Sequence, residues 1–130
     1  MIPWIMILIF AFSPLTFAHE TTGWIAPEEA KKMKNPIKLG KASIEKGRTI
    51  YEMKCASCHG LKGDGKGPGS MGLSPKPTNF KEPHGNKMTD GEHFWKITTG
   101  RGPMPSFKDD LTEEERWHVG NYITTFAKKK

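Results

Sequence analysis

Two cysteines stand three positions apart in this chain of 130 residues, and a histidine follows the second one directly: Cys55, Cys58 and His59. The sequence contains no other cysteine. Thiols one helical turn apart can each form a thioether bond to one haem, and the imidazole that follows can bind the iron as proximal ligand. The pattern therefore predicts covalent attachment of one haem c at these three residues.

Two other kinds of site use a Cys-x-x-Cys pair. A dithiol redox site is expected in a β-α-β context, and a zinc site needs further cysteine or histidine pairs at ligand spacing. The sequence has neither a second cysteine pair nor the runs of valine and isoleucine that are typical of strands. Haem attachment is therefore the interpretation that these residues favour.

The second axial ligand has several candidates, because the chain contains seven methionines and five histidines. Methionines in the leader, in the arm, on the helix of the cysteine motif and in the loop nearest the proximal side are set aside. The candidates that remain are Met88, Met104, His84, His93 and His118. Prolines on both sides of Met104 stiffen its backbone and lower the entropy cost of holding a weak thioether ligand at the iron. Met88 reads as an apolar residue ahead of a helix, and His93 and His118 fall on predicted helices, where core or solvent-facing histidines are commoner. We therefore predict Met104 as the second ligand.

Three main helices are predicted to position these residues. Ser43 is the expected N-cap of the first, which leads into the cysteine motif. Gly47 in its interior is interpreted as a close helix crossing, since glycine there otherwise costs about 1 kcal/mol relative to alanine. Thr89 and Thr112 each begin a capping box with a glutamate three residues later, which predicts one helix up to Gly100 and another near the C-terminus.

The remaining segments are predicted to be loops. Gly60–Gly72 is rich in glycine, Pro75–Pro83 is broken by prolines, and Arg101–Phe107 contains two more prolines. Leu73 and Phe80 are expected to anchor these loops. With 14 glycines and 10 prolines, regular structure is limited, and a large buried cofactor would supply the missing apolar contact.

The N-terminal part divides into two predicted segments. Residues 1–18 have the apolar stretch and the small residues near a cleavage site of a secretory signal peptide, which predicts export to the periplasm. No lysine or arginine precedes that stretch, and an uncleaved membrane anchor is the alternative, although the apolar run is short for one. Residues 19–40 are expected to form an arm with a short helix within Pro27–Lys34, pinned to the body by Trp24 and Ile25. Residues 41–130 then form the haem domain.

The formal net charge is +6, and residues 1–18 contribute no charged side chain. A small basic protein tends to meet acidic surfaces. The lysines are scattered and no nucleic-acid-binding motif is recognisable, so we expect no nucleic-acid partner.

These motifs together resemble those of class I monohaem cytochromes c of the bacterial periplasmic type. The resemblance spans about residues 43–128 and depends on four stretches: CASCHG, Gly67-Pro68 with Leu73 downstream, GRGPMPSF, and the final EEERWHVGNYITTF. It implies an all-α, small cytochrome c fold with three to four main helices and long loops around one covalently bound haem.

The resemblance also implies roles for individual residues. The carbonyl of Pro68 is expected to accept a hydrogen bond from His59, and Arg101 is expected among the haem-binding residues. The first and last helices are expected to cross with Tyr51 against Tyr122.

The function implied is that of a soluble electron carrier rather than an enzyme. With His59 and Met104 both bound, the iron would cycle between Fe(III) and Fe(II) without an open position for a substrate. No set of catalytic acid, base or nucleophile is recognisable in the chain. The alternatives are a haem subunit docked to a larger oxidoreductase or oxidase complex, with the Trp24 arm as its interface, and a ligand-binding or peroxidatic haem protein.

Redox partner proteins are the expected partners. In the family one haem edge is exposed, and lysines in the surrounding loops suggest electrostatic steering toward an acidic docking face: Lys62, Lys66, Lys76 and Lys108. Membrane contact is expected only through a partner complex or an uncleaved leader.

Overall fold

Six α-helices and two short 3-10 helices make up the regular structure of residues 23–127, the part of the chain that the computed structural model describes. In order they are α1 (Glu28–Lys32), α2 (Lys41–Lys54), α3 (Ala56–His59), η1 (Pro68–Ser70), α4 (Pro83–Asn86), α5 (Asp90–Thr99), α6 (Glu113–Ile123) and η2 (Thr124–Phe126). The all-α prediction is confirmed. The predicted signal peptide, residues 1–18, lies outside the described residues. Within 23–127 no helix is long and apolar enough to span a membrane.

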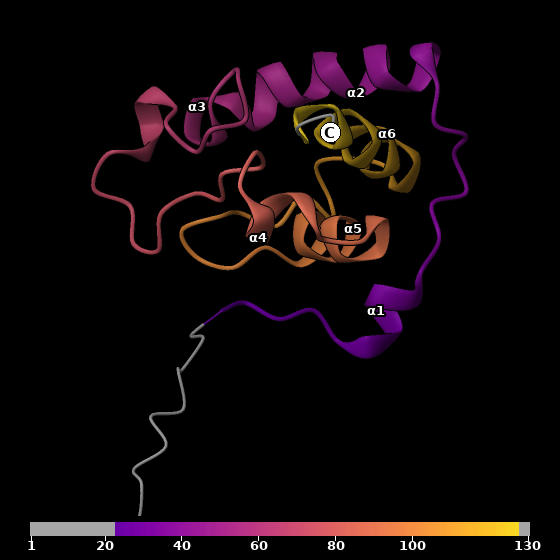
Figure 1. Cartoon of the computed structure of the whole chain (residues 1–130), viewed down its shortest axis with the longest axis horizontal. Helices are drawn as coiled ribbons and strands as arrows, with labels where there is room; N and C mark the ends of the chain where they lie inside the picture. Colours follow the sequence, from indigo (N-terminus) through magenta and orange to yellow (C-terminus); the bar gives the residue numbers. More distant parts are fainter. Residues whose placement is uncertain (1–22, 128–130) are drawn as a thin grey trace, which may run out of the picture.

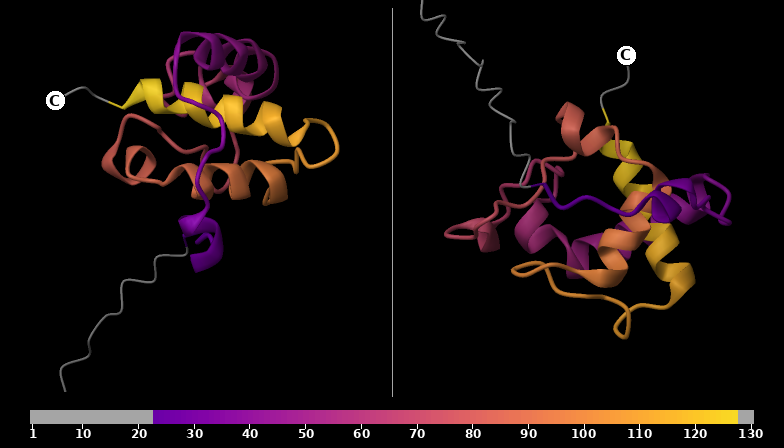
Figure 2. Two further views of the ribbon diagram at one scale, coloured as in Figure 1. Left: turned by 90° about the vertical axis from the view of Figure 1, so that its right-hand side faces the viewer. Right: turned by 90° about the horizontal axis from the view of Figure 1, so that it is seen from below.

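The two longest helices cross at a steep angle. Figure 1 shows α2 running across the molecule with α6 nearly end-on beneath it, and Figure 2 shows α6 from the side with α5 alongside. At the crossing, a Cβ on Gly47 would fall on the backbone carbonyl of His118 and 2.9 Å from Cβ of Tyr122. Tyr51 is fully buried, with its ring centroid 5.2 Å from that of Tyr122. The predicted close crossing is therefore confirmed.

Both predicted capping boxes are present. The hydroxyl of Thr89 accepts a hydrogen bond from the backbone N–H of Glu92, and that of Thr112 accepts one from Glu115. In return, each glutamate carboxylate accepts a hydrogen bond from the backbone N–H of its threonine. These reciprocal bonds satisfy N–H groups that have no partner inside a helix. Helices α5 and α6 therefore begin where the sequence predicts.

The start of α2 differs from the prediction. The helix begins at Lys41, with Gly40 as its N-cap, so Ser43 is not the cap. Its side chain is instead buried within the first turn and hydrogen-bonded to α6. A one-turn helix, α4, also follows the segment that was predicted as a loop.

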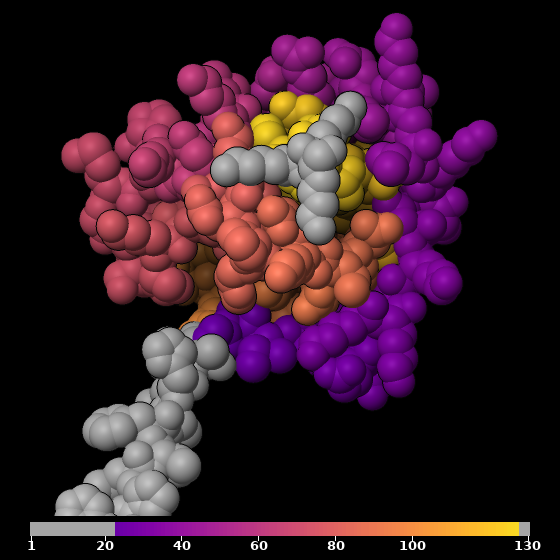
Figure 3. Space-filling view, viewed as in Figure 1, coloured from indigo at the N-terminus to yellow at the C-terminus, as the bar shows by residue number. Residues whose placement is uncertain are grey.

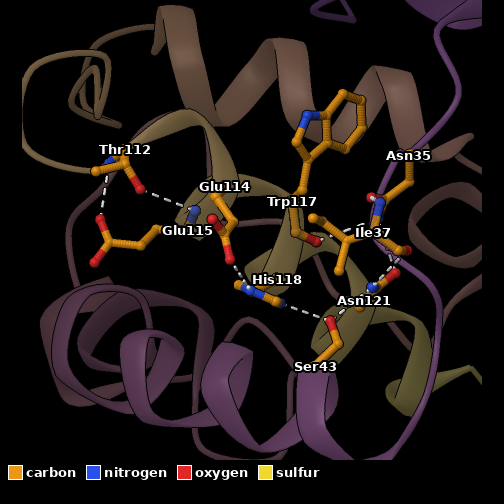
Figure 4. A network of polar contacts seen from close by, with 9 residues as sticks. All are labelled: Asn35, Ile37, Ser43, Thr112, Glu114, Glu115, Trp117, His118 and Asn121. Atoms are coloured by element: carbon orange, nitrogen blue, oxygen red, sulfur yellow. Dashed lines mark hydrogen bonds and ion pairs between the residues drawn. The ribbon is translucent and has the colours of Figure 1, made fainter.

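The hydroxyl of Ser43 belongs to a buried polar network between α2 and α6, which we call the α2–α6 seam (Figure 4). The Asn121 amide donates to Ser43 Oγ at 2.7 Å, and Ser43 Oγ lies 2.7 Å from Nδ1 of His118. Nε2 of His118 lies 3.2 Å from Glu114, so its N–H donates there and Nδ1 accepts from the serine. Asn35 extends the seam to the arm by donating to Asn121 at 2.8 Å.

The arm is held against α5, and Figure 3 shows their side chains in contact along the lower edge of the molecule. The ring centroids of Trp24 and Trp95 are 5.9 Å apart, which agrees with the prediction that Trp24 pins the arm. The same prediction is wrong for Ile25, which is 65% exposed, because its neighbour Ala26 takes the buried position. Thr89 Oγ1 also donates to the Lys31 carbonyl at 3.1 Å.

Candidate haem site

A mainly apolar cavity of about 370 Å³ lies between the end of α2, α3, the loop before α4, α5 and the loop after α5. Its wall contains Cys55, Cys58, His59 and Met104, together with Arg101. Five of the six predicted site residues thus line one cavity, and Arg101 and Met104 come to it from a segment far along the chain from the cysteine motif. Pro68, the remaining predicted residue, is exposed at the start of η1.

The cysteine motif spans the junction between α2 and α3. Cys55 ends α2, and its carbonyl accepts hydrogen bonds from the backbone N–H groups of Cys58 at 3.2 Å and His59 at 2.9 Å. This turn puts both thiols and the imidazole in the wall of the same cavity. The two cysteines are free rather than joined in a disulfide.

The surroundings of the motif disfavour the two alternative sites. Burial raises the pKa of the Cys55 thiol to about 12, so this thiol is not activated as a nucleophile at pH 7. Residues 23–127 also contain no group of three or more His, Cys, Asp or Glu side chains placed to hold a metal ion, so a zinc site has no further ligands there.

His59 is half-buried, and burial lowers its pKa, so that its imidazole is neutral at pH 7 as an iron ligand must be. Its ring stacks on Phe80, with centroids 4.8 Å apart. Nδ1 lies 3.1 Å from the carbonyl of Thr78, and this bond takes the place of the predicted one to Pro68. The reason is that the loop before α4 folds back on the glycine-rich loop, with the N–H of Phe80 donating to the carbonyl of Gly63 at 2.8 Å. The Pro68 bond stays a prediction for the haem-bound protein.

The glycine-rich loop packs tightly onto the motif. A Cβ on Gly67 would fall on the carbonyls of Ala56 and Ser57, so only glycine allows the loop to approach α3 this closely. The N–H of Gly67 bonds to the carbonyl of Cys58 at 3.1 Å. The buried hydroxyl of Tyr51 donates to the carbonyl of Gly60 at 2.8 Å. The loop thus fixes the backbone of the motif.

Met104 is presented by a short, closed loop. The backbones of Arg101 and Met104 exchange two hydrogen bonds, of 2.9 and 2.8 Å, and Phe107 N–H bonds back to the carbonyl of Ile97 in α5. Sequence analysis missed a further support: buried Arg116 donates to three carbonyls of the segment that follows, those of Phe107, Lys108 and Leu111. The loop is therefore pinned on both sides, which agrees with a preorganised position for a weak ligand.

The other candidate ligands lie in different surroundings. Met88, His84 and His93 also line the cavity, whereas His118 belongs to the α2–α6 seam. The sulfur of Met88 lies 3.3 Å from Nζ of Lys96, and His84 is exposed.

The residues present fit a covalently bound haem. Two thiols and an imidazole stand on one wall, a thioether stands in a pinned loop, and most of the lining is apolar. These are the groups that c-type attachment and His/Met ligation require. Fold and site together define a small c-type cytochrome.

The family comparison agrees. Residues 42–123 match the family described as cytochrome c oxidase, cbb3-type, subunit III. The match covers more than half of the chain, so the chain belongs to this family of c-type cytochrome domains, and it carries covalently bound haem c. Members of such a family transfer electrons. No curated protein matches the chain at a significant level.

Two solved structures show the same fold. One is a chain of the Kuenenia stuttgartiensis reducing HAO-like protein complex Kustc0457/Kustc0458, with 29% identity and a TM-score of 0.62 over 72% of this chain. Our chain spans about half of that one, 47%. The other is the KustC0563 c-type cytochrome, with 28% identity and a TM-score of 0.55, where the match covers 63% of our chain and 98% of the other.

Proposed function

We propose that this protein is an exported carrier of single electrons whose haem c is ligated by His59 and Met104. The bound haem supplies an iron that changes between Fe(III) and Fe(II). The proposal depends mainly on one observation: the cavity that contains the cysteine motif also contains Met104, in a loop pinned by backbone hydrogen bonds.

The protein's own residues would serve this role in two ways. His59 and Met104 would hold the iron in both oxidation states, which would leave little to rearrange and no open position for a substrate. The apolar lining excludes water and favours the less charged ferrous state, and a methionine ligand favours it further.

Substitution of Met104 tests the ligand assignment. The ferric protein should show the weak sulfur-to-iron charge-transfer band at the red end of the spectrum, and Met104→Ala should remove it. Because axial ligands set haem potentials across about 0.8 V, we expect the potential to fall by on the order of 0.2 V. Met88→Ala is the matched control and should keep the band. If the band survives in Met104→Ala, the ligand assignment is wrong. If the reduced unaltered protein binds carbon monoxide readily, the six-coordinate carrier is ruled out.

A haem subunit held in a larger complex is the second candidate. The similarity to a chain of a Kuenenia stuttgartiensis protein complex favours it, since our chain corresponds to only part of that chain. Trp24 is less suited to be the interface, because it packs on α5 of its own chain. Gel filtration of native extracts separates the candidates: a free carrier elutes near its own mass, and a bound subunit elutes with its complex.

Export is the remaining part of the proposal. Predicted cleavage after residue 18 would release a mature protein that begins at His19. N-terminal sequencing of the protein from a periplasmic fraction tests this, and a sequence that still begins at Met1 would contradict it.

A further inference from the structure

His93 is a buried polar side chain that the function proposed above does not use. It lies on α5, is only 6% exposed, and lines the haem cavity. The ring of His59 bonds to Thr78 and the ring of His118 bonds at both nitrogens, but within residues 23–127 no hydrogen bond joins the ring of His93 to another residue. Its ring meets the edge of Phe80, with centroids 5.9 Å apart.

The ring nitrogens of His93 face the cavity and are not among the fully buried side-chain atoms without a partner, which within residues 23–127 are Arg116 Nε and Trp117 Nε1. A haem in the cavity would cover them, and a covered polar group without a hydrogen bond is destabilising, a cost that a leucine of similar size would avoid. Burial and the nearby charge of Lys96 lower the pKa of His93 to about 4, so that the imidazole is neutral at pH 7 and offers one N–H donor. Something that enters the cavity is therefore the expected partner.

Haem presents polar groups of only two kinds to its pocket: the iron and the two propionate carboxylates. His59 follows the attachment cysteines and takes one axial position, and we have proposed Met104 for the other. That leaves the carboxylates for His93.

A second side chain on the same wall has the matching charge. Lys96 follows His93 by three positions on α5 and also lines the cavity. Its ammonium lies 5.6 Å from the ring centroid of Trp24 and 3.3 Å from the sulfur of Met88, and no carboxylate of the described residues lies within ion-pair distance of it. A carboxylate at an apolar cavity needs both a cation and hydrogen-bond donors nearby.

We propose that α5 forms the binding site for a haem propionate, with His93 donating its ring N–H to the carboxylate and Lys96 supplying the positive charge. His93 is then a residue that positions the cofactor and adjusts its potential. It does not bind the iron.

The test compares the holoprotein with His93→Leu and His93→Gln. In His93→Leu the propionate loses the N–H donor, and its negative charge near the iron is no longer partly offset. That charge favours Fe(III), so we expect the reduction potential to shift downward. The propionate bending mode in the resonance Raman spectrum should shift as well. His93→Gln keeps an N–H donor and should recover most of both signals. His118→Leu is the matched control: that histidine is equally buried at 6%, and its loss should lower stability without moving the potential.

Two results would overturn the proposal. An unchanged potential and Raman mode in His93→Leu would make His93 a packing residue. A loss of the six-coordinate low-spin spectrum in the same variant would make it an iron ligand.

If His93→Leu yields no holoprotein, NMR of the unaltered ferrous protein decides the question. A nuclear Overhauser contact between the His93 ring and the propionate methylenes supports the proposal, and its absence refutes it. The inference rests on haem binding and on Met104 as ligand. A wrong Met104 assignment would show in the charge-transfer band of the unaltered protein, whereas the role of His93 is measured by the difference between variants.

Discussion

His93 and His118 are equally buried, at 6% exposed, but they lie in regions that differ in one respect. His118 stands in the α2–α6 seam, where Ser43 and Glu114 satisfy both of its ring nitrogens. His93 stands in the cavity wall and has no hydrogen-bond partner in the described chain. The seam is completed by protein groups alone, whereas the cavity wall needs a group that the polypeptide does not contain.

The difference teaches that burial alone does not identify a functional side chain. Buried polar groups are nearly always hydrogen-bonded in folded proteins, so an imidazole that faces the haem cavity without a protein partner points to a polar group of the ligand. A buried imidazole with two partners marks a contact that stabilises the fold. Three experiments address the haem cavity, the α2–α6 seam and the exposed lysines in turn.

Removing the haem should have the largest effect. Cys55→Ala combined with Cys58→Ala prevents covalent attachment, and we expect the chain to lose its cooperative thermal transition in circular dichroism. An empty cavity of 370 Å³ would cost at most about 9 kcal/mol at 24 cal/mol per Å³, which is comparable to the whole stability of a domain this size.

The single variant Cys58→Ala keeps one attachment point and is the control, with most of the transition retained. Cooperative melting of the haem-free double variant would mean that the α2–α6 seam holds the fold by itself.

A substitution in the seam should have an intermediate effect. Gly47→Ala inserts a methyl group against a backbone carbonyl and the Cβ of Tyr122. Overpacking costs about 1–3 kcal/mol, and the better helix propensity of alanine returns part of it, so we expect a net loss of about 1–2 kcal/mol in chemical denaturation of the holoprotein.

Gly120→Ala on α6 is the control, because nothing lies within 4 Å of a Cβ there. That variant should be neutral or up to about 1 kcal/mol more stable. Equal effects of the two alanines would argue against a tight crossing. The haem spectrum should stay the same in both.

The smallest change in stability and in the haem spectrum is expected from a substitution at the surface. The predicted docking lysines are all exposed, and one of them, Lys76, lines the cavity. Lys76→Glu should slow electron transfer to an acidic partner at low salt and leave the spectrum unchanged. The effect should shrink as the Debye length falls from about 30 Å at 0.01 M to about 10 Å at 0.1 M.

Stopped-flow rates against ionic strength measure this. The control is Lys46→Glu, an equal charge change at an exposed position of α2 outside the cavity wall. If both variants behave alike, or if the rate does not depend on salt, steering at the haem edge is refuted.

The features that sequence predicted well depend on residues close together in the chain. Thr89 and Thr112 cap their helices through bonds to residues three positions away, and the cysteine motif lies within a single turn. Gly47 was also predictable, because a glycine inside a helix needs a reason. The fold class and the cofactor followed from such local patterns.

The features that were missed depend on distant partners. Ser43 has the residue type of an N-cap, but its hydroxyl bonds to α6, which no local pattern reveals. Arg116 reads as an ordinary charge on a helix, yet it holds the segment after Met104. His93 was set aside as a core histidine because its expected partner is not an amino acid. A signal was available there, since a histidine at an apolar position of α5 is unusual.

The crossing at Gly47 also limits how this sequence can diverge. A clash with a side chain can be relieved by a smaller residue on the partner helix, so such positions change in pairs. Here the obstacle includes the main-chain carbonyl at position 118, which every amino acid carries. No replacement on α6 can make room while the helices keep their spacing. In natural variants, side chains that meet at the crossing can therefore change in pairs, whereas position 47 should stay glycine.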